Sequence, residues 1–183
     1  MNLQTIACLE LNSIAIGIHA ADEMTKAASV RLVTARTTCP GRYLIVVAGD
    51  TGAVQSAVEA GRAIGGSMVI DYFVIPRVHQ DVIPAMNGAG IAEPIRALGV
   101  IETCTTAAGI LAADAAAKAA NVSLLEIRFA AGLAGKAFVT MTGDVGAVEA
   151  AVQAGVEGVG EAGPVLSHVV IPSPSAELKS QLL

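Results

Sequence analysis

The chain has 183 residues, of which 54% are hydrophobic but only 3% aromatic and only 15% charged, with a net charge of −5. Its lysines and arginines are scattered singly, which argues against nucleic acid as a partner. No apolar run approaches the roughly 20 residues of a membrane-spanning helix, and the N-terminus lacks the basic start and apolar middle of a signal peptide. We therefore expect a cytoplasmic protein with neither nucleic-acid nor membrane partners.

The low charge content also predicts that the chain associates with copies of itself. Soluble domains usually contain roughly 25% charged residues, so part of this surface should be covered by other copies of the chain. The three cysteines, Cys8, Cys39 and Cys104, are too widely spaced for a disulfide framework or a zinc motif. No serine–histidine–aspartate or cysteine–histidine arrangement emerges either, so we do not expect an enzyme.

The first half predicts six elements from its apolar periodicity. Ser13 is a good N-cap residue, and Asp50 is expected to cap the second helix with its carboxylate. Cys39, Pro40 and Gly41 form a tight turn between two apolar runs, which is typical of a hairpin. In chain order the elements are a strand (4–11), a helix (13–28), two strands (30–37 and 43–48), a helix (51–65) and a strand (68–76).

The second half repeats the first. Gly17, Asp22 and Lys26 recur 92 positions later as Gly109, Asp114 and Lys118, and residues 41–61 match residues 135–155 at an offset of 94. Internal repetition this dense indicates a tandem duplication. We predict an α+β protein of two ferredoxin-like βαββαβ domains, at 1–93 and 94–183, each with its helices on one face of its sheet.

The offset between the halves changes from 92 to 94 at one place only. There the loop TTCPGR (37–42) faces the longer loop FAAGLAGK (129–136). The two copies have therefore diverged at this hairpin, and only the first copy carries a cysteine in it. The turns GDTGAV and GDVGAV lack the spacing of phosphate-binding loops, so Asp50 and Asp144 are interpreted as helix caps. Cys8 and Cys104 are interpreted as small core residues.

The repeated motifs resemble those of bacterial microcompartment shell proteins. The similarity rests on the AAD segment followed by K-AA, on GD-x-GAV, and on the closing VIP of 74–76 and 170–172. Two fused copies resemble the tandem-domain class, whose trimers imitate a hexagonal tile of six domains. The loop T-x-CPG-R resembles the iron–sulfur type from propanediol-utilisation compartments.

This resemblance implies a homotrimer that forms a pseudohexameric tile in the shell of a bacterial microcompartment. It also implies one [4Fe–4S] cluster per trimer, held on the threefold axis by three Cys39 thiolates. Because such a cluster takes about four ligands, one cysteine per chain suffices only when symmetry brings three together. The implied role is electron transfer across the shell or cluster supply to encapsulated redox enzymes. The residues expected around the cluster are Thr38, Pro40, Gly41, Ala131, Gly132, Leu133 and Ala134.

The resemblance further implies a tile edge that contacts other shell proteins through Lys26, Lys118, Arg77 and His79. Two alternatives stay open. One keeps the tile as a gated metabolite pore without a cluster, in which Cys39 is an incidental thiol. The other is a ligand-sensing regulator built from tandem ferredoxin-like domains.

Overall fold

A computed structural model describes residues 5–90, 94–129, 132–160 and 165–182. Two compact units emerge within this part of the chain. The first unit contains residues 5–78 together with 132–135, and the second contains the described residues of 79–129 and 136–182. The predicted boundary between residues 93 and 94 borders 91–93, which lie outside the described residues, and it stays a prediction.

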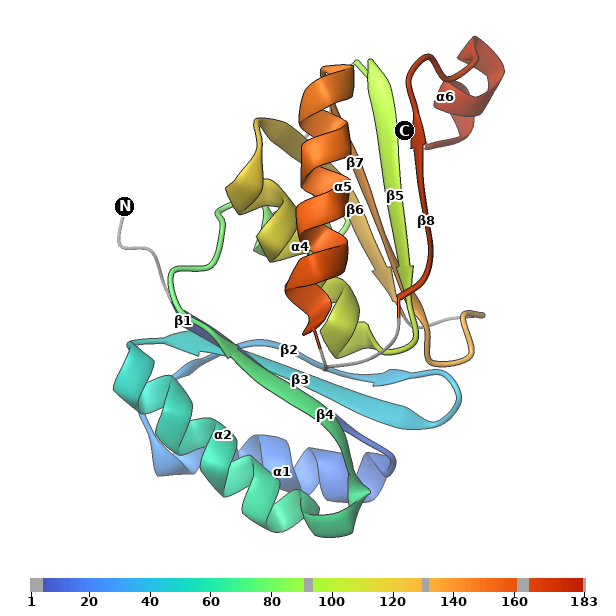
Figure 1. Ribbon diagram of the computed structural model, residues 1–183. Coiled ribbons are helices and arrows are strands. Elements are labelled where there is room, and N and C mark those ends of the chain that lie inside the picture. The colour runs from blue at the N-terminus through green and yellow to red at the C-terminus, as the bar shows by residue number, and fades with distance from the viewer. Residues whose placement is uncertain (1–4, 91–93, 130–131, 161–164, 183) are drawn as a thin grey trace. The chain divides into compact units, whose positions relative to one another are not determined.

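The first unit has the predicted element order, with a four-stranded antiparallel sheet in the order β2-β3-β1-β4. Its two long helices lie side by side against one face of this sheet (Figure 1). The elements are β1 (Thr5–Leu11), α1 (Ile14–Ala27), β2 (Arg31–Thr38), β3 (Arg42–Gly49), α2 (Thr51–Gly65), a short 3-10 helix (Gly66–Met68) and β4 (Val69–Ile75).

The second unit repeats this arrangement, with an antiparallel sheet in the order β6-β7-β5-β8. The prediction of two βαββαβ domains is therefore confirmed. Two short helices were not predicted from the sequence, α3 (Val82–Met86) and α6 (Ala176–Leu182). The repeated elements are β5 (Ala97–Thr103), α4 (Thr106–Ala119), β6 (Val122–Phe129), β7 (Ala137–Gly143), α5 (Val145–Val159) and β8 (Val165–Ile171).

The core of the first unit lies between the sheet and its helices. Strand residues alternate between the two faces of a sheet, so every second residue of β1 and β3 points toward α1 and α2. Apolar burial of this kind is the main favourable term in folding. The core residues of β1, β3, α1 and α2 are Ala7, Leu9, Leu11, Tyr43, Ile45, Val47, Ala20, Ala21, Met24, Val54, Ala57 and Val58.

Both copies of the first helix begin with the same kind of cap. Ser13 Oγ accepts a hydrogen bond from the Ile16 amide at 3.3 Å, and Thr105 Oγ1 accepts one from the Ala108 amide at 3.1 Å. These bonds satisfy amides that have no partner inside the helix. The described helices include none that is both long and apolar enough to cross a membrane.

The predicted side-chain caps at Asp50 and Asp144 are wrong. Both residues occupy the N-cap position of α2 and α5, but neither carboxylate makes a capping hydrogen bond. The Asp144 carboxylate pairs with the Arg96 guanidinium instead. At Asp50 the first helical residues, Thr51 and Gly52, are exposed, so water can satisfy their amides.

A glycine near the start of α1 allows the helix to approach its sheet closely. A Cβ atom on Gly17 would lie 2.4 Å from the Cβ of Tyr43. The repeat preserves this contact, because a Cβ on Gly109 of α4 would lie 2.8 Å from the Cβ of Ala137. By contrast, a Cβ on Gly52 would meet no atom within 4 Å.

These two helical glycines should respond oppositely to alanine. We expect Gly17→Ala to lower the free energy of unfolding by about 1–3 kcal/mol, because the new methyl group overpacks the helix–sheet contact. Gly52→Ala should raise it by about 0.4–1 kcal/mol, because alanine restricts the unfolded chain without a clash. Urea unfolding at one fixed protein concentration measures both. Equal effects of the two substitutions would contradict the close approach at Gly17.

Candidate functional site

The two hairpin tips differ in length as the sequence predicts. In the first hairpin, Thr37 pairs with Tyr43 and encloses the five residues 38–42. In the second, Phe129 pairs with Ala137 and encloses the seven residues 130–136. The change of offset from 92 to 94 is therefore a two-residue difference at the tips. We call 38–42 the cysteine tip and the described residues 132–136 the long tip.

The cysteine tip is a tight reversal between β2 and β3. The Gly41 amide donates a hydrogen bond to the Thr38 carbonyl at 3.0 Å, and the Cys39–Pro40 peptide bond is cis. Gly41 has a φ of 92°, a conformation that favours glycine. Cys39 is a half-buried free thiol in this turn. The tip therefore holds one thiol at the end of a short, constrained loop.

Thr38, the residue before the thiol, is only 4% exposed. Its Oγ1 atom is buried and has no hydrogen-bond partner. Buried polar groups almost always have a partner, and one without calls for an explanation. The cysteine tip thus combines a thiol with an unused buried hydroxyl.

The other two cysteines lie elsewhere in the fold. Cys8 is wholly buried in β1, which confirms its interpretation as a core residue. Burial raises the pKa of the Cys8 thiol well above its usual range, and the charges of Glu10 and Asp71 add to this effect. Cys104, between β5 and α4, is half-buried rather than in the core, because it precedes the helix cap at the end of its strand.

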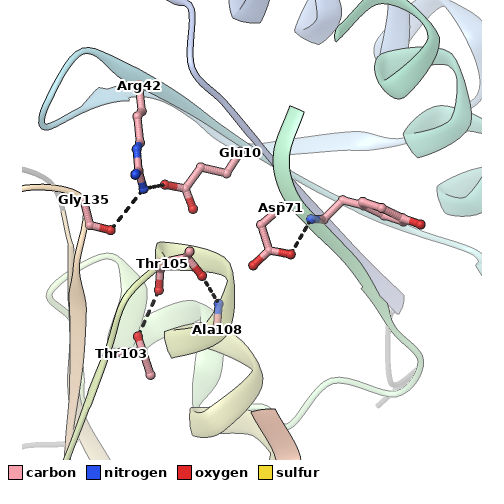
Figure 2. Close-up of polar contacts among 8 residues, drawn as sticks. Glu10, Arg42, Asp71, Thr103, Thr105, Ala108 and Gly135 are labelled. Atoms are coloured by element: carbon pink, nitrogen blue, oxygen red, sulfur yellow. Dashed lines mark hydrogen bonds and ion pairs between the residues drawn. The ribbon is translucent and has the colours of Figure 1, made fainter. Parts of the chain in front are cut away.

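An ion pair lies at the base of the cysteine tip (Figure 2). Arg42 Nη1 donates to Glu10 Oε1 at 3.0 Å and to the carbonyl oxygen of Gly135 at 3.4 Å. Glu10 is wholly buried, and Arg42 is mostly buried. Arg42 therefore joins the cysteine tip to the long tip, although the two are 93 residues apart in sequence.

The second half carries the equivalent pair in a different setting. Lys136 and Glu102 occupy the positions of Arg42 and Glu10, and Lys136 Nζ lies 3.2 Å from Glu102 Oε1. Both of these side chains are exposed. Neither pair was predicted as part of the site. The signal was present in the repeat, since an acidic and a basic residue recur at matching positions in both halves.

The long tip has a backbone conformation that depends on small residues. Gly132, Ala134 and Gly135 all have positive φ angles, of 81°, 50° and 88°. Gly132 and Ala134 are exposed, Leu133 is half-buried and Gly135 is buried. Ala131, also predicted to surround the cluster, lies outside the described residues. The described part of this tip up to Gly135 belongs to the first unit, which carries Cys39.

The predicted edge lysines have different surroundings. Lys26 is exposed and pairs with Asp22 and Glu23, and the hydrogen bond to Asp22 raises the pKa of Lys26. Lys118 pairs with Asp114 instead, whose carboxylate is largely buried.

The other two predicted edge residues follow the last strand of the first unit. Arg77 is exposed and has a φ of 51°. His79 is half-buried, and its amide donates to the Asp114 carboxylate at 2.8 Å. Lys118 and His79 therefore meet at one carboxylate in the second unit, whereas Lys26 and Arg77 lie in the first unit.

No cluster of three or more histidine, cysteine or acidic side chains suited to a metal ion occurs within residues 5–90, 94–129, 132–160 and 165–182 of one chain.

Comparison with known sequences gives a family match over most of the chain. A family model described as the BMC domain matches twice, at residues 5–78 and 97–174. The bacterial microcompartment shell protein PduT of Citrobacter freundii is 41% identical over 180 residues, which cover 98% of each chain. The carboxysome shell protein CsoS1A of Hydrogenovibrio crunogenus is 38% identical over 86 residues, 45% of this chain and 88% of its own.

Solved structures give the same picture. A microcompartment protein from Desulfitobacterium hafniense DCB is 48% identical, with a TM-score of 0.89 over 97% of this chain and 98% of that one. A fused permuted hexameric shell protein from the RMM microcompartment is 21% identical, with a TM-score of 0.66 over 85% of this chain and 83% of that one. The second similarity extends to the fold alone.

Cys39 and Cys8 should differ in reactivity. In iron-free, reduced protein we expect a neutral alkylating reagent to modify Cys39 and to leave Cys8 unmodified, even at about pH 9. The reactive form of cysteine is the thiolate, and the raised pKa of buried Cys8 keeps it protonated. Mass spectrometry of the alkylated peptides measures this. Modification of Cys8 in the folded protein as fast as in urea would contradict its burial.

Proposed function

The chain belongs to the family of bacterial microcompartment shell proteins that carry BMC domains, and from this premise we propose that three copies form a pseudohexagonal tile with a [4Fe–4S] cluster at its centre. Two domains per chain make three chains equivalent to a hexagon of six. The observation that supports a cluster is the single thiol, Cys39, at the tip of a constrained hairpin.

The exposure of α1 supports ring formation by copies of the chain. Ile18 on α1 is 56% exposed, whereas its equivalent on α4, Ile110, is 0% exposed. Ile14 is also exposed, whereas its equivalent Thr106 is buried. The same helix surface is thus covered in one repeat and open in the other. An open surface of isoleucines favours association with an apolar surface of another copy.

The sheets show the opposite difference. Phe73 on β4 is 7% exposed, whereas its equivalent on β8, Val169, is 46% exposed. Each chain therefore leaves a helix surface open on its first repeat and a sheet surface open on its second. We infer that these two surfaces meet in a head-to-tail contact between copies, and such contacts close into rings when the rotation permits.

The residues of the cysteine tip fit an iron–sulfur cluster. Three Cys39 thiolates from three chains would supply three of about four ligands, leaving one iron to a small ligand. The buried, unpartnered Thr38 hydroxyl is a hydrogen-bond donor beside the thiol. Hydrogen bonds to the sulfur atoms and solvent exposure tune the reduction potential of such clusters. A bound cluster would supply one-electron chemistry.

The role of the tile follows from these parts. The protein would supply shell surface and would hold the cluster at the centre of the tile. Electrons would pass across the shell to or from enclosed redox enzymes, or the cluster would be delivered to them. The tile edge would contact other shell proteins through Lys26 and Arg77, which are exposed in the first unit, and through Lys118 and His79 in the second.

Iron analysis tests the cluster. In protein prepared without oxygen we expect about one four-iron cluster per three chains, with matching sulfide and an EPR signal after reduction. Cys39→Ser should lose it, because an alcohol is a poor replacement for a thiolate ligand. Chemical iron and sulfide assays with EPR measure the difference.

Cys104→Ser is the matched control, since Cys104 is also a half-buried free thiol. It should keep the full iron content. Iron-free protein after attempted reconstitution of the native chain would overturn the cluster and favour the alternative of a metabolite pore. Retention of iron by Cys39→Ser would assign the metal to residues other than Cys39.

Two substitutions on α1 should separate ring closure from tiling. Ile18→Glu places a charge on the open helix surface and should convert trimers to smaller species, because burying an unpaired charge is costly. Lys26→Ala should leave the trimer intact and reduce its growth into flat sheets. Light scattering after gel filtration gives the mass, and electron microscopy shows the sheets.

Met68→Glu is the control for the first substitution, because Met68 is an exposed apolar residue outside both open surfaces. It should leave the trimer unchanged. A trimer that tolerates Ile18→Glu would exclude this helix surface from the ring. Normal sheets of Lys26→Ala would exclude Lys26 from the edge contact.

A further inference from the structure

We propose that Arg42 is a positioning residue that clamps the cysteine tip to the long tip, so that each tip orders the other. The clamp consists of three groups on two tips and one strand: the Glu10 carboxylate, the Arg42 guanidinium and the Gly135 carbonyl (Figure 2). The consequence for a cluster rests on the function proposed above, whereas the clamp itself does not depend on it.

Burial fixes one end of the clamp. Glu10 is wholly buried in β1, and a buried carboxylate is strongly destabilising unless a cation and hydrogen bonds accompany it. Arg42 supplies that cation at 3.0 Å. Thr38 pairs with Arg42 across the hairpin, so Cys39 lies between two residues that pair with each other. Fixing the position of Arg42 therefore fixes the base of the loop that carries Cys39.

Close packing fixes the other end. A Cβ atom on Gly135 would lie 2.7 Å from Arg42 Nη1 and 2.8 Å from its Cζ. The guanidinium thus rests directly on the glycine backbone and donates to its carbonyl. Gly41, the equivalent of Gly135 in the cysteine tip, has a similar φ of 92° but no atom within 4 Å of its Cβ position. The approach is therefore specific to Arg42 and Gly135 and not a general property of these hairpins.

The equivalent ion pair in the second half does not form a clamp. Lys136 and Glu102 lie 3.2 Å apart but are exposed, and exposed ion pairs contribute little. Arginine also differs from lysine in kind, because its planar guanidinium directs several N–H bonds at fixed angles. Only the first half combines a buried carboxylate, a guanidinium and a neighbouring tip.

Hydrogen–deuterium exchange on iron-free protein tests the clamp. Arg42→Gln should accelerate amide exchange about tenfold in both the cysteine tip and the long tip, because it removes charge-assisted hydrogen bonds that restrain both. Gly135→Ala should accelerate exchange in the cysteine tip, because the new methyl group displaces the guanidinium. Arg42→Lys keeps a cation beside Glu10 and replaces Arg42→Gln in this experiment if that variant does not fold. It should accelerate exchange mainly in the long tip.

Gly132→Ala is the matched control. Gly132 lies in the same tip with a similar φ of 81°, but a Cβ there would meet no atom within 4 Å. Both alanines therefore carry the same kind of backbone strain, and only one touches Arg42. Gly132→Ala should affect the long tip alone. Exchange that changes only in the substituted tip for every variant would overturn the clamp.

Cluster retention then tests the consequence. In air, Arg42→Gln and Gly135→Ala should lose the visible absorbance of the cluster about tenfold faster than the native protein and Gly132→Ala, in proportion to the more frequent opening of the tip. If the native protein contains no iron, the cluster proposal fails, and hydrogen exchange alone decides whether the clamp exists. If the native protein contains the cluster but the exchange rates of the two tips change independently, the clamp proposal fails and the cluster proposal stands.

Discussion

A four-stranded sheet with helices on one face leaves its other face in need of a cover, and this constraint governs the whole protein. On the helix-free face of the first sheet, Cys8, Val46 and Phe73 are apolar and buried. On the second sheet the equivalent of Phe73, Val169, is exposed. Apolar area of this kind favours association strongly. A sheet face of this kind therefore favours contact with a further apolar surface.

Duplication also explains how one fold came to hold two kinds of hairpin. Gly17 and Gly109 allow the same close helix–sheet approach, and Ser13 and Thr105 cap the same helix start. These positions serve the interior of a domain, so both copies need them. The tips differ between the copies instead, because one carries a thiol and the other has two more residues. In the proposed tile they would serve the assembly rather than the interior of a domain.

In the proposed tile, a hairpin tip carrying a single thiol has a weakness, because one ligand per chain would have to reach a shared position reproducibly. Sheets and helices hold side chains more precisely than loops do. Arg42 compensates by linking the cysteine tip to the wholly buried Glu10 of β1. Its contact with Gly135 extends the same order to the second tip. The precision of the site thus derives from the core, through one ion pair.

The sequence by itself determined the repeated βαββαβ domains, the 51–65 limits of α2 and the two-residue difference between the tips, because these follow from periodicity and from comparing the chain with itself. It also identified the family, through motifs that occur twice. Only the tertiary structure decided that Asp144 pairs with Arg96 rather than capping α5, that α3 and α6 are helical, and that Glu10, Arg42 and Gly135 meet. Such contacts join residues 32 to 93 positions apart, and local pattern carries no information on which distant groups compete for one charge.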